Sequence, residues 1–176
     1  SKYYFINKKP SYQLGIVNDK LGAKISFEPG FESNFSGMFG MNRLDNNWIL
    51  TGELNLQMEN YFKSAERGEF FWRRIDSLSQ TIKIGTILPH PFGWRTGVDI
   101  NYQHEIFRGL YASIENRYLL STYFPLIGTT GFGYVTGKTT PTLIGKENGY
   151  EKTSYYAFSL FSKKENLNDR YLPTLG

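Results

Sequence analysis

The most regular pattern of hydrophobic and polar positions lies in residues 94–120. Between residues 94 and 103, the even positions are mostly hydrophobic and the odd positions are polar or glycine. The same pattern resumes after Arg108-Gly109 and continues to Leu120. Alternation with a period of two places successive side chains on opposite faces of a strand. The segment therefore predicts a hairpin whose two strands, each about 9–11 residues long, have one apolar and one polar face.

Similar but shorter patterns recur along the chain and predict further strands. They cover residues 12–17, 23–28, 35–42, 48–59, 80–88, 128–137 and 156–160. Residues 63–69 and 138–152 are polar and predict loops, and the second of these is longer than most connections. Residues 70–76 are the least regular, and they are interpreted as either a strand end or a folded loop. The total is about eight to ten strands, with no convincing helix.

The patterning and composition together favour a membrane barrel. No apolar run approaches the ~18–20 residues of a transmembrane helix, but a barrel strand exposes only alternate residues to lipid. Aromatic residues make up 17% of the chain, with 13 Tyr and 14 Phe, and such side chains suit the bilayer interface. The 18 glycines suit the bends of a curved sheet. We expect residues 1–176 to form one antiparallel transmembrane β-barrel domain, or a segment of one, in the outer membrane of a Gram-negative bacterium. The alternative is a soluble β-sandwich or lipocalin-like barrel.

Charge and cysteine content narrow the possible partners. The 20 basic and 16 acidic residues give a net charge of +4 and are interspersed, so we expect no nucleic-acid binding. Exposed Lys and Arg side chains are expected to meet outer-membrane lipid head groups instead. Cysteine is absent, which excludes disulfides and thiolate chemistry. The opening residues do not contain an apolar segment long enough for a signal peptide.

The polar side of the predicted strands holds the candidate functional residues. Seven charged residues are expected to line the lumen of the barrel: Glu53, Glu59, Lys83, Arg95, Asp99, Glu115 and Arg117. Residues of mixed sign can border a polar passage, or they can pair across strands and stabilise a small filled barrel. Both interpretations remain open.

Bond chemistry has little support in the sequence. His104 is close in sequence to Asp99 and Glu105, and Ser113 lies on the partner strand, but no nucleophile motif accompanies them. The alternation also places His104 on the apolar side, and His90 between two prolines is interpreted as a turn residue. We predict neither metal nor cofactor, because no His, Asp or Glu group has ligand spacing. The chain is expected not to be an enzyme, with a lipid-modifying outer-membrane enzyme that uses His104 as its base as the alternative.

Two stretches, residues 31–56 and 72–103, carry glycine-bearing strands in close succession. In this they resemble the barrel of the BamA and two-partner-secretion translocator superfamily. The resemblance implies a segment of a larger barrel that takes part in outer-membrane protein assembly or translocation, with other outer-membrane or secreted proteins as partners. The alternative function is that of a small structural or adhesion barrel.

Overall fold

The computed structural model describes residues 11–17, 20–26, 30–44 and 47–164. The chain divides into two units, Ser1–Glu32 and Ser33–Gly176. In the first unit, β1 (Ser11–Val17) and β2 (Lys20–Ser26) form an antiparallel hairpin. Tyr12 pairs with Ile25, so the hairpin has an apolar face, as the alternation predicts. Its separation from the other strands in a sheet of its own was not evident from the sequence.

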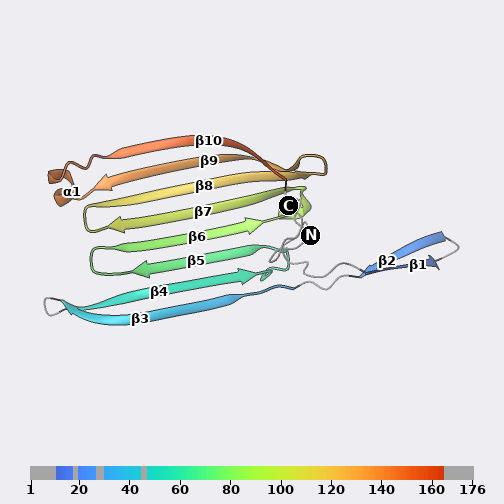
Figure 1. Ribbon diagram of the computed structural model, residues 1–176, viewed down its shortest axis with the longest axis horizontal. Helices are drawn as coiled ribbons and strands as arrows, with labels where there is room; N and C mark the ends of the chain where they lie inside the picture. Colours follow the sequence, from blue (N-terminus) through green and yellow to red (C-terminus); the bar gives the residue numbers. More distant parts are fainter. Residues whose placement is uncertain (1–10, 18–19, 27–29, 45–46, 165–176) are drawn as a thin grey trace. The chain divides into compact units, whose positions relative to one another are not determined.

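The second unit contains one antiparallel sheet of eight strands, in which each strand pairs with its neighbours in sequence (Figure 1). The strands are β3 (Asn34–Leu44), β4 (Asn47–Glu59), β5 (Arg67–Arg74), β6 (Gln80–Leu88), β7 (Thr96–Phe107), β8 (Tyr111–Phe124), β9 (Gly128–Pro141) and β10 (Thr153–Lys163). Among the described residues, β3 and β10 are the two edges of this sheet. The all-β, antiparallel prediction is therefore confirmed.

The hairpin predicted in residues 94–120 is formed by β7 and β8. Arg108 and Gly109 turn the chain with φ angles of 48° and 65°, and the Leu110 N–H donates to the Phe107 carbonyl at 2.8 Å. A left-handed backbone at two successive positions is what a tight antiparallel turn requires. The strand β8 is longer than predicted, because residues 121–124 continue it beyond Leu120. Ser121 and Thr122 pair with both β7 and β9, and residues 123 and 124 pair with β9.

Three other boundaries were predicted wrongly. Residues 67–74 form the regular strand β5, whereas residues 63–69 were expected to be a polar loop and residues 70–76 either a strand end or a folded loop. Residues 138–141 extend β9, so the long connection covers only residues 142–152. That connection contains the short helix α1 (Leu143–Glu147), although no helix was predicted, and the Thr142 hydroxyl caps it by accepting the Gly145 N–H at 3.1 Å.

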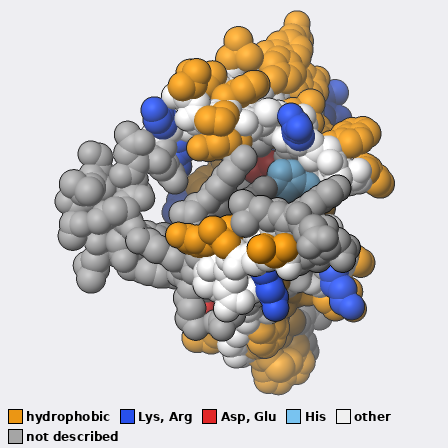
Figure 2. All heavy atoms as spheres, turned by 90° about the vertical axis from the view of Figure 1, so that its right-hand side faces the viewer, with side chains coloured by type: hydrophobic (Ala, Val, Ile, Leu, Met, Phe, Trp, Pro, Cys, Tyr) orange, Lys and Arg blue, Asp and Glu red, His pale blue; other side chains and the backbone are white. Residues whose placement is uncertain are grey.

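The register gives the sheet two chemically distinct faces. Leu54 pairs with Trp72, and Trp72 with Ile82; the side that carries these residues is called the apolar face. Glu53 pairs with Arg73, on the opposite side, which is called the polar face. Among the described residues no hydrophobic side chain is buried, and many large ones are exposed. Figure 2 shows hydrophobic side chains along the outer rim, with acidic side chains and a histidine nearer the middle.

The strands are also staggered. One row of paired residues crosses the whole sheet: Gly37, Leu54, Trp72, Ile82, His104, Ile114, Lys138 and Ser154. Toward the end of the sheet where α1 lies, β3 continues seven residues beyond this row, to Leu44. In the same direction, β10 continues only one residue, to Thr153. The strand ends are therefore offset by six residues, or about 20 Å at ~3.3 Å per residue. Such stagger accompanies the strand tilt of a barrel.

Candidate functional site

The polar face is the candidate functional site, because it carries nearly all of the predicted functional residues. The register places Glu53, Glu59, Lys83, Asp99, Glu115 and Arg117 on this face. Arg95 does not lie on a strand: it is exposed in the connection between η1 (Pro91–Gly93) and β7. The alternation was sufficient to assign these six residues because successive side chains of a strand point to opposite faces.

Two ion pairs on β5 were not predicted from the sequence. Arg73 Nε lies 2.8 Å from Glu53 Oε2 on β4, and Arg67 Nε lies 2.9 Å from Glu69 Oε1 within β5. Arg73 belongs to the segment whose pattern appeared irregular, and Arg67 belongs to the segment before it, which was predicted to be a polar loop. The Arg73–Glu53 pair joins residues 20 positions apart, so only the register of β4 and β5 reveals it. These pairs bring opposite charges together on one side of the sheet.

A second polar group joins β8 to β10. Arg117 Nη2 donates to Glu115 Oε1 at 3.1 Å, and the Tyr155 hydroxyl donates to Glu115 Oε2 at 2.5 Å. Glu115 is thus held by a cation on its own strand and by a hydroxyl two strands away. On β7, Asn101 Nδ2 donates to Asp99 Oδ1 at 2.5 Å. Glu53 accepts from Arg73, and Glu59 accepts from Gln57 Nε2 at 3.3 Å, so all four predicted lumen carboxylates have hydrogen-bond partners within the sheet.

An aromatic ring on the polar face is flanked by two cations. The Arg73 guanidinium carbon is 5.1 Å from the centre of the Phe71 ring, and Lys83 Nζ is 5.9 Å from it. Both distances fall within the range of cation–π attraction. Phe71 is the reason the hydrophobic pattern of β5 is obscured, because it is an apolar residue on the polar side, directly between Phe70 and Trp72 on the other.

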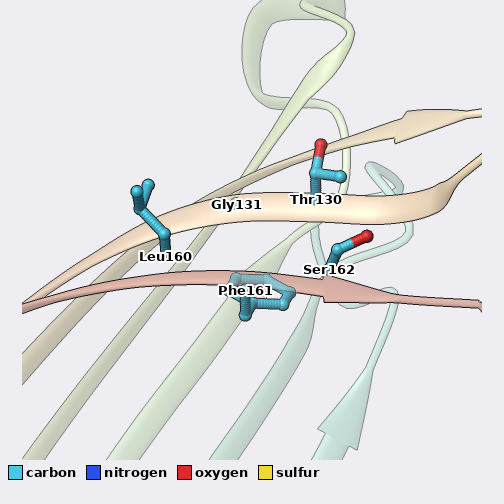
Figure 3. A pocket seen from close by; sticks show the side chains of 5 residues that line it. All are labelled: Thr130, Gly131, Leu160, Phe161 and Ser162. Atoms are coloured by element: carbon cyan, nitrogen blue, oxygen red, sulfur yellow. The ribbon is translucent and has the colours of Figure 1, made fainter.

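On β9, the polar face is built from glycines that β10 side chains cover. The Phe161 ring lies over Gly131, and the Tyr155 ring lies over Gly137. A shallow hollow runs along these two strands and is lined by Thr130, Gly131, Leu160, Phe161 and Ser162 (Figure 3). In Figure 3, Leu160 and Thr130 extend to one side of the strands and Phe161 to the other. The hollow is open and holds no converging charged groups, so it has no features of a ligand site.

The groups considered for catalysis do not meet. His104 lies on the apolar face between Ile82 and Ile114, whereas Asp99, Glu105 and Ser113 belong to the opposite face. A hydrogen-bonded nucleophile, base and carboxylate require side chains on the same side of a sheet. Among the described residues, no cluster of His, Asp or Glu is suited to hold a metal ion.

The β4–β5 connection is folded around one buried carboxylate. Glu66 is only 5% exposed, and it accepts the N–H groups of Phe62 and Ser64 and the Ser64 hydroxyl. Burial alone would raise the pKa of this carboxyl. The Ser64 hydroxyl and the backbone N–H groups outweigh that effect and hold the pKa below its usual value of 4.5. The loop presents Tyr61 and Phe62, whose rings meet edge to face at 5.2 Å, to the exterior.

Three connections at the other end of the sheet are joined by hydrogen bonds. The Gly109 N–H donates to the Leu78 carbonyl at 2.8 Å, and the Thr142 N–H donates to the Leu110 carbonyl at 2.9 Å. Tyr150 of the long connection lies 5.4 Å from Tyr111, ring centre to ring centre. The connection that follows β9 is therefore packed against the end of β8.

Comparison with family models, curated proteins and solved structures found no match to this chain. Within the part of the chain that the structure describes, no helix is both long enough and apolar enough to cross a membrane.

Proposed function

We propose that this chain forms the wall of a β-barrel in a bacterial outer membrane, with the apolar face toward lipid and the polar face toward the interior. One observation carries the proposal: the described residues contain no buried hydrophobic side chain, although 40% of the sequence is hydrophobic. A water-soluble domain of this length buries a hydrophobic core. Here most hydrophobic side chains of the eight strands lie on one side of a single sheet, where lipid would cover them.

The size of the apolar face supports this proposal. Eight strands spaced ~4.8 Å apart are about 38 Å wide, and a membrane barrel has an apolar band about 25 Å tall. The product is roughly 1,000 Å², well above the largest apolar patch of a typical soluble monomer, about 300–600 Å². A lipocalin-like barrel would turn these side chains inward instead. The salt-bridged polar face would then be outside, and the two arrangements predict opposite solvent access for Leu54 and Glu53.

The stagger of the strands is of the size that a barrel needs. An offset of about 20 Å across seven strand spacings, roughly 34 Å, corresponds to a strand tilt of about 30°. This is slightly less than the 35–45° typical of barrels. Along a tilted strand, 8–14 residues span about 22–40 Å of membrane, which brackets the apolar band.

Protein assembly or translocation is the function class that we propose for this barrel. The mixed charges of the polar face would line the passage or seam through which a partner protein moves. Such a passage needs a barrel wider than eight strands, because the interior of an eight-stranded barrel is just wide enough for its own side chains. The proposal therefore requires the edges β3 and β10 to pair with additional strands.

The second candidate is a small structural or adhesion barrel, and the match between the two edge strands favours it. Each has 11 residues, and with eight alternating strands β3 and β10 are antiparallel. Pairing all 11 residues of each puts Ser159 opposite Met38, and the next register that keeps the faces aligned puts Ser159 opposite Gly40. The polar groups and rings between β8 and β10 would then fill the interior.

Two tryptophans on the apolar face, and a third that precedes β7, make the membrane proposal testable. Trp48 is near the start of β4, Trp72 is near the centre of the sheet, and Trp94 precedes β7 at the opposite end. In variants with one Trp retained and the others changed to Phe, bromine-labelled lipids should quench Trp72 most strongly from deep in the acyl chains. Trp48 and Trp94 should be quenched best by shallow labels. Equal quenching at every depth, or none, would reject the membrane-spanning orientation.

The choice between the two functions can be tested by cysteine pairing, since the natural chain has no cysteine. Ser159→Cys combined with Met38→Cys or Gly40→Cys should form a disulfide in the folded protein if β3 pairs with β10. Ser159→Cys combined with Phe39→Cys, whose side chain is on the other face, is the matched control. A cross-link in neither test pair, in a protein that inserts normally, would favour the wider barrel and the assembly or translocation function.

A further inference from the structure

The apolar face carries few charges, and they are all of one sign. In the eight described strands of the larger sheet, the register places only three charged residues on this face, and all three are basic: Arg43, Arg74 and Lys138. All six acidic residues of these strands belong to the polar face: Glu53, Glu59, Glu69, Asp99, Glu105 and Glu115. The apolar face thus carries positive charge without any negative charge.

The three cations also lie toward one end of the sheet. Arg43 is the next-to-last residue of β3, Arg74 is the last residue of β5, and Lys138 is three residues from the end of β9. These strands all run toward the end at which α1 lies (Figure 1). Arg43, Arg74 and Lys138 together are called the basic border. Arg74 is anchored there, since its Nε donates to the Asp76 carbonyl at 3.2 Å.

The opposite end of the apolar face has different chemistry. A row of paired hydroxyl residues crosses four strands there: Thr96, Thr122, Thr130 and Ser162. The Thr96 and Thr122 hydroxyls are 3.2 Å apart. Hydroxyl groups suit a neutral interface, whereas guanidinium and ammonium groups pair with phosphate. The two ends of the apolar face therefore differ in the lipid head groups that they would stabilise.

We propose that the basic border binds the anionic phosphates of lipid head groups, and that it sets which end of the barrel faces the more anionic leaflet. The inference rests on the proposed membrane function. It commits to lipid because the cations are next to exposed apolar side chains: Arg43 pairs with Trp48, which is 65% exposed. The cations are on β3, β5 and β9, about 10 Å and 19 Å apart around the sheet. That spacing fits several head groups better than one phosphate ligand.

The test measures insertion from urea into vesicles of phosphatidylcholine alone and into vesicles in which phosphatidylglycerol replaces part of it. The natural sequence should favour the anionic vesicles. The variant Arg43→Gln/Arg74→Gln/Lys138→Gln should lose this preference by roughly fivefold for each cation removed, about a hundredfold in all, since a Lys or Arg near an anionic surface contributes about 1 kcal/mol. Added salt should weaken the preference of the natural sequence, because exposed charges are screened.

The matched control is Lys24→Gln/Lys63→Gln/Lys83→Gln, which removes the same charge from places outside the basic border. It should keep the anionic preference. If both triple variants lost the anionic preference equally, general charge attraction would explain it and the inference would be overturned. A natural sequence with no preference for anionic vesicles would also overturn it. Arg74→Gln alone, with an expected loss of about fivefold, covers the case in which the triple variant does not fold. Insertion into neither kind of vesicle would reject the membrane function itself, and with it the basic border as a lipid site.

Discussion

Replacing Leu54 with arginine is the most direct perturbation of the two-faced sheet. Leu54 lies on the apolar face, between Gly37 of β3 and Trp72 of β5. In a lipid-facing position near the bilayer midplane, Arg costs about 2–4 kcal/mol. That corresponds to a fall of about 30- to 1,000-fold in the folding equilibrium constant, at 1.4 kcal/mol per factor of ten. In a sheet whose apolar face met water, the same change would be close to neutral.

The neighbouring residue supplies the control. Asn55 is exposed on the polar face, where Asn55→Arg places the same side chain one residue away but toward the interior. We expect this variant to lose less than about 1 kcal/mol, as surface substitutions usually do. Trp48→Arg, near the end of the same strand, tests depth, because the cost of Arg falls to about 0–1 kcal/mol near the interface. The expected order of destabilisation is therefore Leu54→Arg above both other variants.

The measurement is reversible urea unfolding in phospholipid vesicles, with gel migration before and after heating as an independent check of folding. Linear extrapolation gives the free energy of unfolding for each variant. If Leu54→Arg and Asn55→Arg were equally stable, the assignment of the apolar face to lipid would be refuted. If Asn55→Arg alone were strongly destabilised, the two faces would have to be exchanged, and the chain would be a barrel with an apolar interior.

Three further predictions concern local structure. Glu66→Gln should destabilise the protein by about 1–3 kcal/mol at neutral pH, because hydrogen bonds to a buried carboxylate are weakened. The pKa of Glu66 is lowered in the folded protein, so the stability difference between the variant and the natural sequence should disappear as the pH falls through that pKa. Urea unfolding at a series of pH values measures this. Gly131→Val should cost about 1–3 kcal/mol by urea unfolding, since a Cβ there would meet the Leu120 carbonyl and Phe161, whereas Gly15→Ala, with open space, should be neutral. Tyr155→Phe removes the hydroxyl that Glu115 accepts and should cost about 1–2 kcal/mol; no change in unfolding would mean that this contact is not stabilising.

The face assignments could be predicted from the sequence because they depend on a local rule. In a strand, residues two apart share a side, so Glu53, Asp99 and Arg117 were placed on one face without knowledge of any pairing. The same rule could not assign the faces of β5, because three successive residues, Phe70, Phe71 and Trp72, are all aromatic. Only the neighbouring strands show that Phe71 faces the cations of the polar side and the other two face away.

The contacts of the polar face could not be predicted from the sequence, because they depend on which residues of neighbouring strands pair. The Arg73–Glu53 pair requires the register between β4 and β5, and the Tyr155–Glu115 hydrogen bond requires two successive registers, β8–β9 and β9–β10. α1 was missed for another reason: a five-residue helix is too short to display a 3.6-residue period. Its start was marked only by the capping hydroxyl of Thr142.

The edges of the sheet determine which function the two faces can serve. A strand exposes unpaired backbone N–H and C=O groups along its free side, and in hydrocarbon each such group costs several kcal/mol. With 11 residues in β3 and 11 in β10, the apolar face can meet lipid only if both edges are paired. Pairing with each other makes a barrel whose interior is filled by the rings and ion pairs of the polar face, and nothing as large as a protein can then pass. Pairing with further strands separates those groups from the opposite wall and opens the passage that translocation requires. The same residues, Glu115, Arg117 and Tyr155, would be packing groups in the first barrel and the wall of a water-filled passage in the second.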